Sequence, residues 1–271
     1  MQAIAPLLLF VACAAPSRRL TVRVVDDPIV LPSRLAAAAI EGSAFRHQPA
    51  ASTTGSVLPA FRVGITDRLE LTDLLSLRYA FLDDAPSSSR QRRSPLSLAL
   101  RAGLTGFGVS STDGFVMWPL LSLQALRHLG DRWSLSLSAG FRGRFANRDR
   151  ASDGVPDQYL FPTSSRWSNL STGLSALRQM TDHIAIGAGA GVEQYQGCLQ
   201  PLCAWVSRDA WFTVRLVVRP WPWLSLALVP ETGFRYRPLI LPAALDPSGE
   251  AKVPPQTVSW LGGSGDVTFY W

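Results

Sequence analysis

The sequence predicts an all-β chain that closes into a transmembrane antiparallel up-and-down β-barrel, with about 12 strands or, as the alternative, about 10. Segments of alternating apolar and polar residues recur along the chain, and many of them are joined in pairs by tight turns. Longer polar connections separate these pairs. Only 17% of the 271 residues are charged while 47% are hydrophobic, a charged fraction well below that of an ordinary soluble domain.

Composition limits the class further. No apolar run beyond the amino terminus reaches the roughly 18 residues that a spanning helix needs, so any membrane crossing must be made by strands. The nine Trp and twelve Phe suit the aromatic girdles that barrels place at both membrane surfaces. The net charge of +6 comes mainly from arginines scattered singly along the strands. Because they form no basic patch interleaved with aromatic residues, a nucleic-acid partner is not expected.

The carboxyl terminus has the pattern of a strand that closes such a barrel. Val267, Phe269 and Trp271 stand at alternate positions and end the chain on an aromatic residue. This tail resembles the carboxyl-terminal assembly signal of outer-membrane proteins of Gram-negative bacteria, although Gly265 stands where that family usually has an apolar residue. The resemblance implies an outer-membrane location, insertion by the barrel-assembly machinery, contact with outer-membrane lipid and a final strand that descends to the periplasm.

The amino-terminal region is expected to lie outside the barrel. Residues 1–17 hold an apolar run followed by small residues, which predicts a secretory signal peptide. Within it, Leu9–Cys13 resembles a lipoprotein cleavage box, so Cys13 is a candidate lipidation site. Residues 18–33 contain two prolines, which cannot donate to a sheet ladder. We therefore expect a periplasmic lead-in there and the barrel over residues 34–271.

The alternating segments divide the barrel into strands. In order, we expect strands at residues 34–46, 61–65, two short ones within 69–82, and then 95–107, 115–129, 133–145, 167–179, 184–195, 208–219, 223–236 and 256–271. Tight turns are predicted near residues 67–68, 130–132, 181–183 and 219–222. Longer loops are predicted at 47–56, 146–166, 196–207 and 237–256. Short turns at one end and long loops at the other are typical of bacterial barrels.

The stretch 69–82 decides the strand count. If it were one strand, the total would be odd, whereas single-chain bacterial barrels have an even number. We therefore expect a break at Thr72 and Asp73, with a periplasmic loop over 83–93 after the second short strand. The terminal strand is expected to pair with the first strand, near residues 34–46.

Two further cysteines fall in the predicted loop 196–207. Cys198 and Cys203 are close in the sequence of what would be an exported protein, so a disulfide between them is expected. A metal site is not expected, because no histidine or further cysteine lies near them.

Alternation also predicts which side chains face the lumen. The apolar face of each strand must meet lipid, so the polar face points inward. The candidate lumen lining is Arg62, Arg78, Arg101, Arg142, Arg144, Glu193, Arg215, Glu231 and Arg235. The candidate lipid-facing girdle is Trp133, Trp167, Trp211, Trp223, Tyr236, Phe269 and Trp271. The arginines could form a cationic pore that favours small anionic solutes, or they could pair with carboxylates and simply fill a narrow barrel.

A passive role follows from these features. We expect a narrow channel or a structural barrel with an arginine-lined lumen; the alternatives are a surface-presenting or adhesive barrel and a lipid-modifying enzyme of the outer membrane. No catalytic, cofactor or metal site is predicted, because His47 lies in a predicted loop and His128 and His183 lie at predicted turns, away from a nucleophile.

Overall fold

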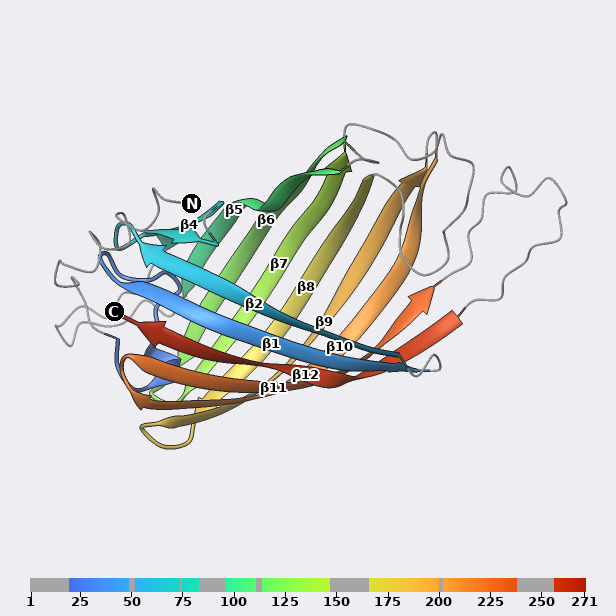
Figure 1. Cartoon of the computed structure of the whole chain (residues 1–271). Coiled ribbons are helices and arrows are strands. Elements are labelled where there is room, and N and C mark those ends of the chain that lie inside the picture. The colour runs from blue at the N-terminus through green and yellow to red at the C-terminus, as the bar shows by residue number, and fades with distance from the viewer. Residues whose placement is uncertain are drawn as a thin grey trace, which may run out of the picture.

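The computed structural model describes residues 20–48, 52–73, 75–82, 96–110, 114–146, 166–199, 202–237 and 256–271. They form a closed antiparallel barrel of twelve strands, in which each strand is hydrogen-bonded to its neighbours in the sequence and β12 to β1 (Figure 1). This confirms the predicted fold class and the higher of the two strand counts. Residues 1–19, with the predicted signal peptide and Cys13, lie outside the described residues.

The strands are β1 (Ala36–Gln48), β2 (Ser52–Gly64), β3 (Leu69–Thr72), β4 (Ser76–Leu82), β5 (Ser97–Ser110), β6 (Gly114–Leu129), β7 (Trp133–Ala146), β8 (Arg166–Gln179), β9 (Ile184–Leu199), β10 (Leu202–Trp221), β11 (Leu224–Arg237) and β12 (Gln256–Tyr270). One short 3-10 helix, η1 (Val24–Asp26), precedes them. No helix in the described part of the chain is long and apolar enough to cross a membrane.

Two ends of the barrel can be distinguished by their connections. The tight turns at 65–68, 130–132, 180–183 and 222–223 lie at the end that also holds the carboxyl terminus, which we call the turn end. The opposite end, the loop end, carries the connections over 147–165 and 238–255, whose residues are outside the described ranges. In bacterial barrels short turns face the periplasm, so the turn end corresponds to the periplasmic side.

The closing seam joins β1 to β12 as expected. Its register runs from Ala37 opposite Tyr270 to Gln48 opposite Ser259. At the turn end the ladder finishes with a reciprocal pair: Ala36 N donates to Trp271 O at 2.9 Å, and Trp271 N donates to Ala36 O at 3.0 Å. The last residue of the chain therefore takes part in closing the barrel.

The predicted break between Thr72 and Asp73 is present and separates β3 from β4. Asp73 has a φ of 52°, a left-handed conformation that aspartate tolerates better than most residues. Because β3 is short, it pairs with only Arg62, Val63 and Gly64 of β2. Among the described residues, the part of β2 nearer the loop end is thus paired with a neighbouring strand only on its β1 side. The wall of the barrel is shorter on the β3 side.

Two of the predicted loops are strand instead. β1 and β2 extend to Gln48 and from Ser52, and β9 and β10 extend to Leu199 and from Leu202, so the expected loops over 47–56 and 196–207 shrink to connections of a few residues. The sequence there is polar, but polarity does not end a strand whose backbone groups are satisfied by neighbouring strands.

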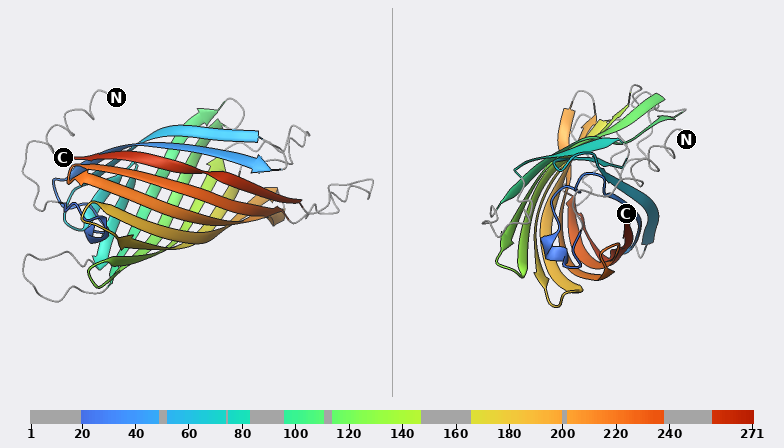
Figure 2. Two further views of the ribbon diagram at one scale, coloured as in Figure 1. Left: turned by 90° about the horizontal axis from the view of Figure 1, so that it is seen from below. Right: turned by 90° about the vertical axis from the view of Figure 1, so that its left-hand side faces the viewer.

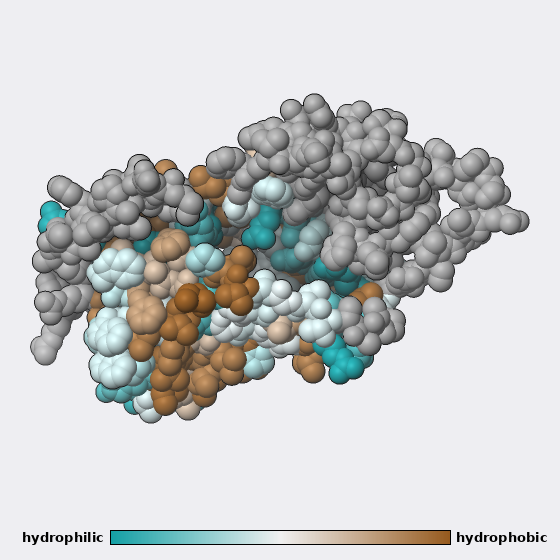
Figure 3. Space-filling view, viewed as in Figure 1, coloured by the Kyte–Doolittle hydropathy of each residue, from teal (hydrophilic) through white to brown (hydrophobic). Residues whose placement is uncertain are grey.

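The outer surface of the strands is apolar. Outward side chains such as Leu137, Leu174, Phe212, Val214 and Leu228 are exposed in the isolated barrel, and Figure 3 shows apolar residues gathered over the strands nearest the viewer. At the turn end Trp221 and Trp223 stack at 5.1 Å. A belt of this kind matches the lipid-facing band and aromatic girdle of a membrane barrel.

The predicted girdle is partly correct. Trp133, Trp223, Tyr236, Phe269 and Trp271 are all exposed. Trp211 was assigned wrongly, because its side chain lines the lumen. The side chain of Trp167 lies outside the described set.

The amino-terminal segment, residues 20–35, lies within the barrel mouth at the turn end. An end-on view shows η1 and the chain around it inside the ring of strands (Figure 2). Val30 is 0% exposed and packs in a cluster with Ile29 and with the inward residues Ala80 and Ala99 of the wall. We expected an extended periplasmic lead-in over 18–33 and no spanning strand. The sequence did not indicate that residues 20–33 lie in the lumen at the turn end.

Candidate functional site: the barrel lumen

A buried carboxylate organises the turn-end half of the lumen. Glu70 on β3 is 0% exposed. It accepts two hydrogen bonds from Arg62, Nε to Oε1 and Nη2 to Oε2, both at 2.8 Å, and its Oε1 lies 3.5 Å from Nη1 of Arg78. Thr72 Oγ1 donates to the same carboxylate at 3.0 Å. The register brings them together, because Arg62 stands opposite Thr72 and Glu70 stands opposite Arg78.

A second ion pair continues this network toward the loop end. Arg101 Nη2 donates to Asp73 Oδ2 at 2.5 Å, and Arg101 Nε donates to Ser76 Oγ at 3.0 Å. Three of the predicted lumen arginines, Arg62, Arg78 and Arg101, are thus paired with carboxylates at residues 70 and 73.

The amino-terminal segment is held in this half by polar contacts as well as packing. Leu31 N donates to Glu70 Oε2 at 2.7 Å. Arg219, which is 1% exposed, makes a two-pronged ion pair with Asp27, Nη1 to Oδ1 at 2.6 Å and Nη2 to Oδ2 at 2.7 Å. Such paired, two-pronged geometry is among the stronger side-chain contacts in proteins. The segment is therefore attached to the wall through side chains of β3 and β10.

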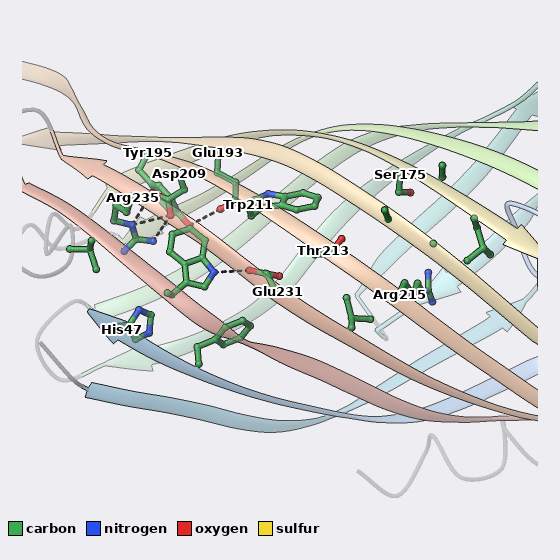
Figure 4. A pocket seen from close by; sticks show the side chains of 18 residues that line it. His47, Ser175, Glu193, Tyr195, Asp209, Trp211, Thr213, Arg215, Glu231 and Arg235 are labelled. Carbon is green, nitrogen blue, oxygen red and sulfur yellow. Dashed lines mark hydrogen bonds and ion pairs between the residues drawn. The ribbon is translucent and has the colours of Figure 1, made fainter. Parts of the chain in front are cut away.

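Among the described residues the lumen also contains a cavity of about 600 Å³ whose wall is formed by β1 and by β8 through β12 (Figure 4). Its lining extends along β8 and β9 to Leu177 and Gly187. We call it the loop-end cavity because Glu193, Asp209 and Arg235 lie in the loop-end halves of their strands. Its charged lining residues are Glu193, Asp209, Arg215, Glu231 and Arg235, and its aromatic ones are Phe45, Tyr195, Trp211 and Trp260. The described part of the lumen thus holds both a region filled by residues 20–35 and a cavity.

Three carboxylates face this cavity with different partners. Asp209 is neutralised by Arg235, whose Nε and Nη2 donate to it at 2.8 Å and 2.6 Å. Glu193 accepts from Tyr195 Oη at 2.8 Å and from Asn169 Nδ2 at 3.2 Å. Glu231 accepts from Trp260 Nε1 at 3.0 Å. Only the first of these carboxylates has a cationic partner among the described residues.

The other predicted lining residues are placed as follows. Arg142 and Arg215 are exposed, and no ion pair or hydrogen bond holds either of them within the described part of the chain. The side chains of Arg144, Cys198 and Cys203 are outside the described set, but the register sets Cys203 directly opposite Cys198. Val267, Phe269 and Trp271 face outward, as expected for an assembly signal at the lipid surface.

Several important residues were not identified from the sequence. Glu70, Asp73 and Asp209 partner the predicted arginines, yet the sequence does not reveal the register that joins them. Asp27, in the expected lead-in, was not identified as a partner of Arg219. Trp211 and Arg215 are four residues apart on one strand, so their side chains face the same side of the sheet. This spacing could have placed Trp211 in the lumen.

No family model matches the sequence, and no curated protein matches it. Among solved structures, an outer membrane channel from Pseudomonas putida F1 is similar at 13% identity and a TM-score of 0.50, covering 94% of this chain and 100% of that one. OmpT, an outer membrane protein of Vibrio cholerae, has 7% identity and a TM-score of 0.39, covering 88% and 97%. The outer membrane protease OmpT from Escherichia coli has 6% identity and a TM-score of 0.34, covering 88% and 96%.

Fold and surface together define the class. A closed antiparallel barrel with an apolar outer face and a polar lumen is the structure of an outer-membrane β-barrel protein of a Gram-negative bacterium. The protein is a member of that broad class and is located in the outer membrane.

Proposed function

We propose that the protein is a narrow passive channel that residues 20–35 close in the conformation described above. The division of the lumen carries this proposal. A barrel that serves only as a scaffold can be filled by the side chains of its own strands. Here the described residues leave a cavity in the lumen, and the turn end is filled by a separate segment that side-chain polar contacts and apolar packing hold against the wall.

We further propose that the channel discriminates only weakly between anions and cations. The expected anion preference depended on seven lumen arginines. Carboxylates offset the charge of Arg62, Arg101 and Arg235. Arg142 and Arg215 make no ion pair among the described residues, but Glu193 and Glu231 also lack one and oppose their charge.

Conductance in planar bilayers tests the channel. The wild-type protein is expected to open rarely, and Asp27→Asn is expected to open more often, because it breaks the ion pair with Arg219. Asp182→Asn, at an exposed turn of the same end, is the matched control and should behave as wild type. A variant lacking residues 20–33, shown to be folded by heat-modifiable migration on a gel, should conduct continuously. Silence of that variant would refute the channel.

No specific observation favours the two alternatives. His47 Nε2 is hydrogen-bonded to Thr54 Oγ1 at 3.0 Å, and His183 Nδ1 lies 3.0 Å from the carbonyl oxygen of Arg219. The connections over 147–165 and 238–255, on which a surface-presenting role would depend, are outside the described residues. We therefore retain the passive channel as the proposed function.

A further inference from the structure

We propose that the loop-end cavity is a binding site for an organic cation with an aromatic or apolar body. This goes beyond conduction, because the site can bind such a molecule whether or not the lumen conducts. The proposal depends on the shape of the cavity wall, on the partners of its carboxylates and on the position of its arginines.

The cavity wall is built from aromatic rings that lie against glycines. A Cβ on Gly191 would come within 2.3 Å of Cζ2 of Trp211, and a Cβ on Gly233 within 2.3 Å of Cζ2 of Trp260. The register sets each tryptophan opposite its glycine on the next strand. Because the glycines have no side chain, each indole can lie close to the neighbouring strand, and both tryptophans line the cavity. Figure 4 shows Trp211 among the lining side chains. Ring faces carry negative quadrupole charge and attract cations.

The same wall carries two carboxylates without a cationic partner. The donors to Glu193 are the hydroxyl of Tyr195 and the amide of Asn169, and the donor to Glu231 is the indole of Trp260. These neutral groups orient the carboxylates but do not cancel their charge.

Neither of the two arginines that line the cavity takes the place that a bound cation would occupy. Arg235 is already bonded to Asp209 by two nitrogens, and its Cζ lies 5.4 Å from the ring centre of Tyr195. Arg215 stands four residues beyond Trp211 along β10, roughly 13 Å away at the usual rise of a strand. Arg235 also interacts electrostatically with Glu193, so the end of the cavity near Trp211 and Trp260 has one guanidinium group beside the carboxylates of Glu193, Asp209 and Glu231. This excess of negative charge beside aromatic rings favours an organic cation over an anion or a neutral molecule.

Calorimetric titration of the folded barrel in non-ionic detergent tests the site. The probe is benzyltrimethylammonium, compared with benzyl alcohol and benzenesulfonate at the same ionic strength. The cation should bind at least about tenfold more tightly than either comparison molecule. Equal affinity for the cation and the alcohol would overturn the proposal.

Charge-removing variants complete the test. Glu231→Gln keeps an oxygen that can accept from Trp260 and should weaken cation binding about fivefold, as should Glu193→Gln. Glu41→Gln removes a lumen carboxylate that does not line the cavity and should bind like wild type. Wild-type affinity in both cavity variants would refute the site. Each variant must show heat-modifiable migration first. A conducting protein that fails to bind would refute only the site, and a silent protein that binds would refute only the channel.

Discussion

At the scale of single residues, the most consequential group is the buried carboxylate of Glu70. It compensates two guanidinium groups and also accepts the hydrogen bond from Leu31 N. A buried charge that loses its partner is strongly destabilising, whereas the intact pair adds little over apolar packing. Glu70 is therefore important mainly because removing its charge would destabilise the folded protein.

Glu70→Gln should lower the free energy of unfolding by about 3 kcal/mol, because it leaves the part-buried guanidinium groups of Arg62 and Arg78 without their carboxylate partner. Urea unfolding of the protein refolded into lipid vesicles measures this. Glu41→Gln, which removes an inward carboxylate with no ion pair among the described residues, should change stability by less than about 0.5 kcal/mol. If the two variants have the same free energy of unfolding, the assigned role of Glu70 is wrong.

The cysteines give a second residue-scale prediction. Directly opposite residues on antiparallel strands have Cα atoms about 4.5–5.5 Å apart, within the range that a disulfide spans. We expect Cys198 and Cys203 to be joined in protein taken from the outer membrane. Peptide mapping with thiols alkylated before reduction should recover the two residues in one cross-linked peptide. Recovery of both as alkylated thiols would contradict the prediction, and Cys203→Ser provides a control with one free thiol.

At the scale of elements, the amino-terminal segment is fitted to one glycine of β2. A Cβ on Gly64 would lie 1.9 Å from the carbonyl oxygen of Pro32, which is backbone and cannot rotate away. Two backbone hydrogen bonds join the segment to this glycine: Arg34 N donates to Gly64 O at 3.0 Å, and Gly64 N donates to Leu35 O at 2.8 Å. The position therefore fixes where the segment leaves the wall.

Gly64→Ala should displace the segment while leaving the strands paired. Hydrogen exchange followed by mass spectrometry should show faster exchange at Leu31 and Ser33, whose amides donate to Glu70 and Asp67. Gly42→Ala is the matched control, since nothing lies within 4 Å of its added Cβ. Unchanged exchange in both variants would mean that the segment is not held at Gly64.

Elements also show how far sequence reasoning reaches. Alternation and parity predicted the break at Thr72–Asp73 and the pairing of β12 with β1, because both follow from local pattern and from closure. The ends of β1 and β9 and the site of residues 20–35 could not be predicted. They depend on which strand stands opposite, and neither polarity nor proline content reveals a partner distant in the sequence. Trp211 shows the same limit, since an aromatic residue faces inward where a neighbouring strand supplies glycine.

At the scale of the whole molecule, closure makes the barrel depend on its last residues. β12 pairs with β11 along its length and with β1 across the seam, so its loss would leave two open edges in the membrane. Unsatisfied backbone groups are costly in lipid, where no water can pair with them. We therefore propose that the carboxyl-terminal strand serves both recognition by the assembly machinery and the stability of the finished barrel.

Two changes at the terminus separate these roles. Deleting residues 269–271 removes the Trp271–Ala36 hydrogen bonds and the aromatic signal together, and should abolish the heat-modifiable band in outer-membrane fractions. Trp271→Ala keeps the backbone bonds and removes only the outward ring, so the protein refolded in detergent should still be heat-modifiable while its amount in the outer membrane falls. Trp271→Phe retains an aromatic end and should assemble normally. If Trp271→Ala reaches the outer membrane in wild-type amounts, the terminal aromatic is not an assembly signal, and Trp271 acts only through the seam that its backbone closes.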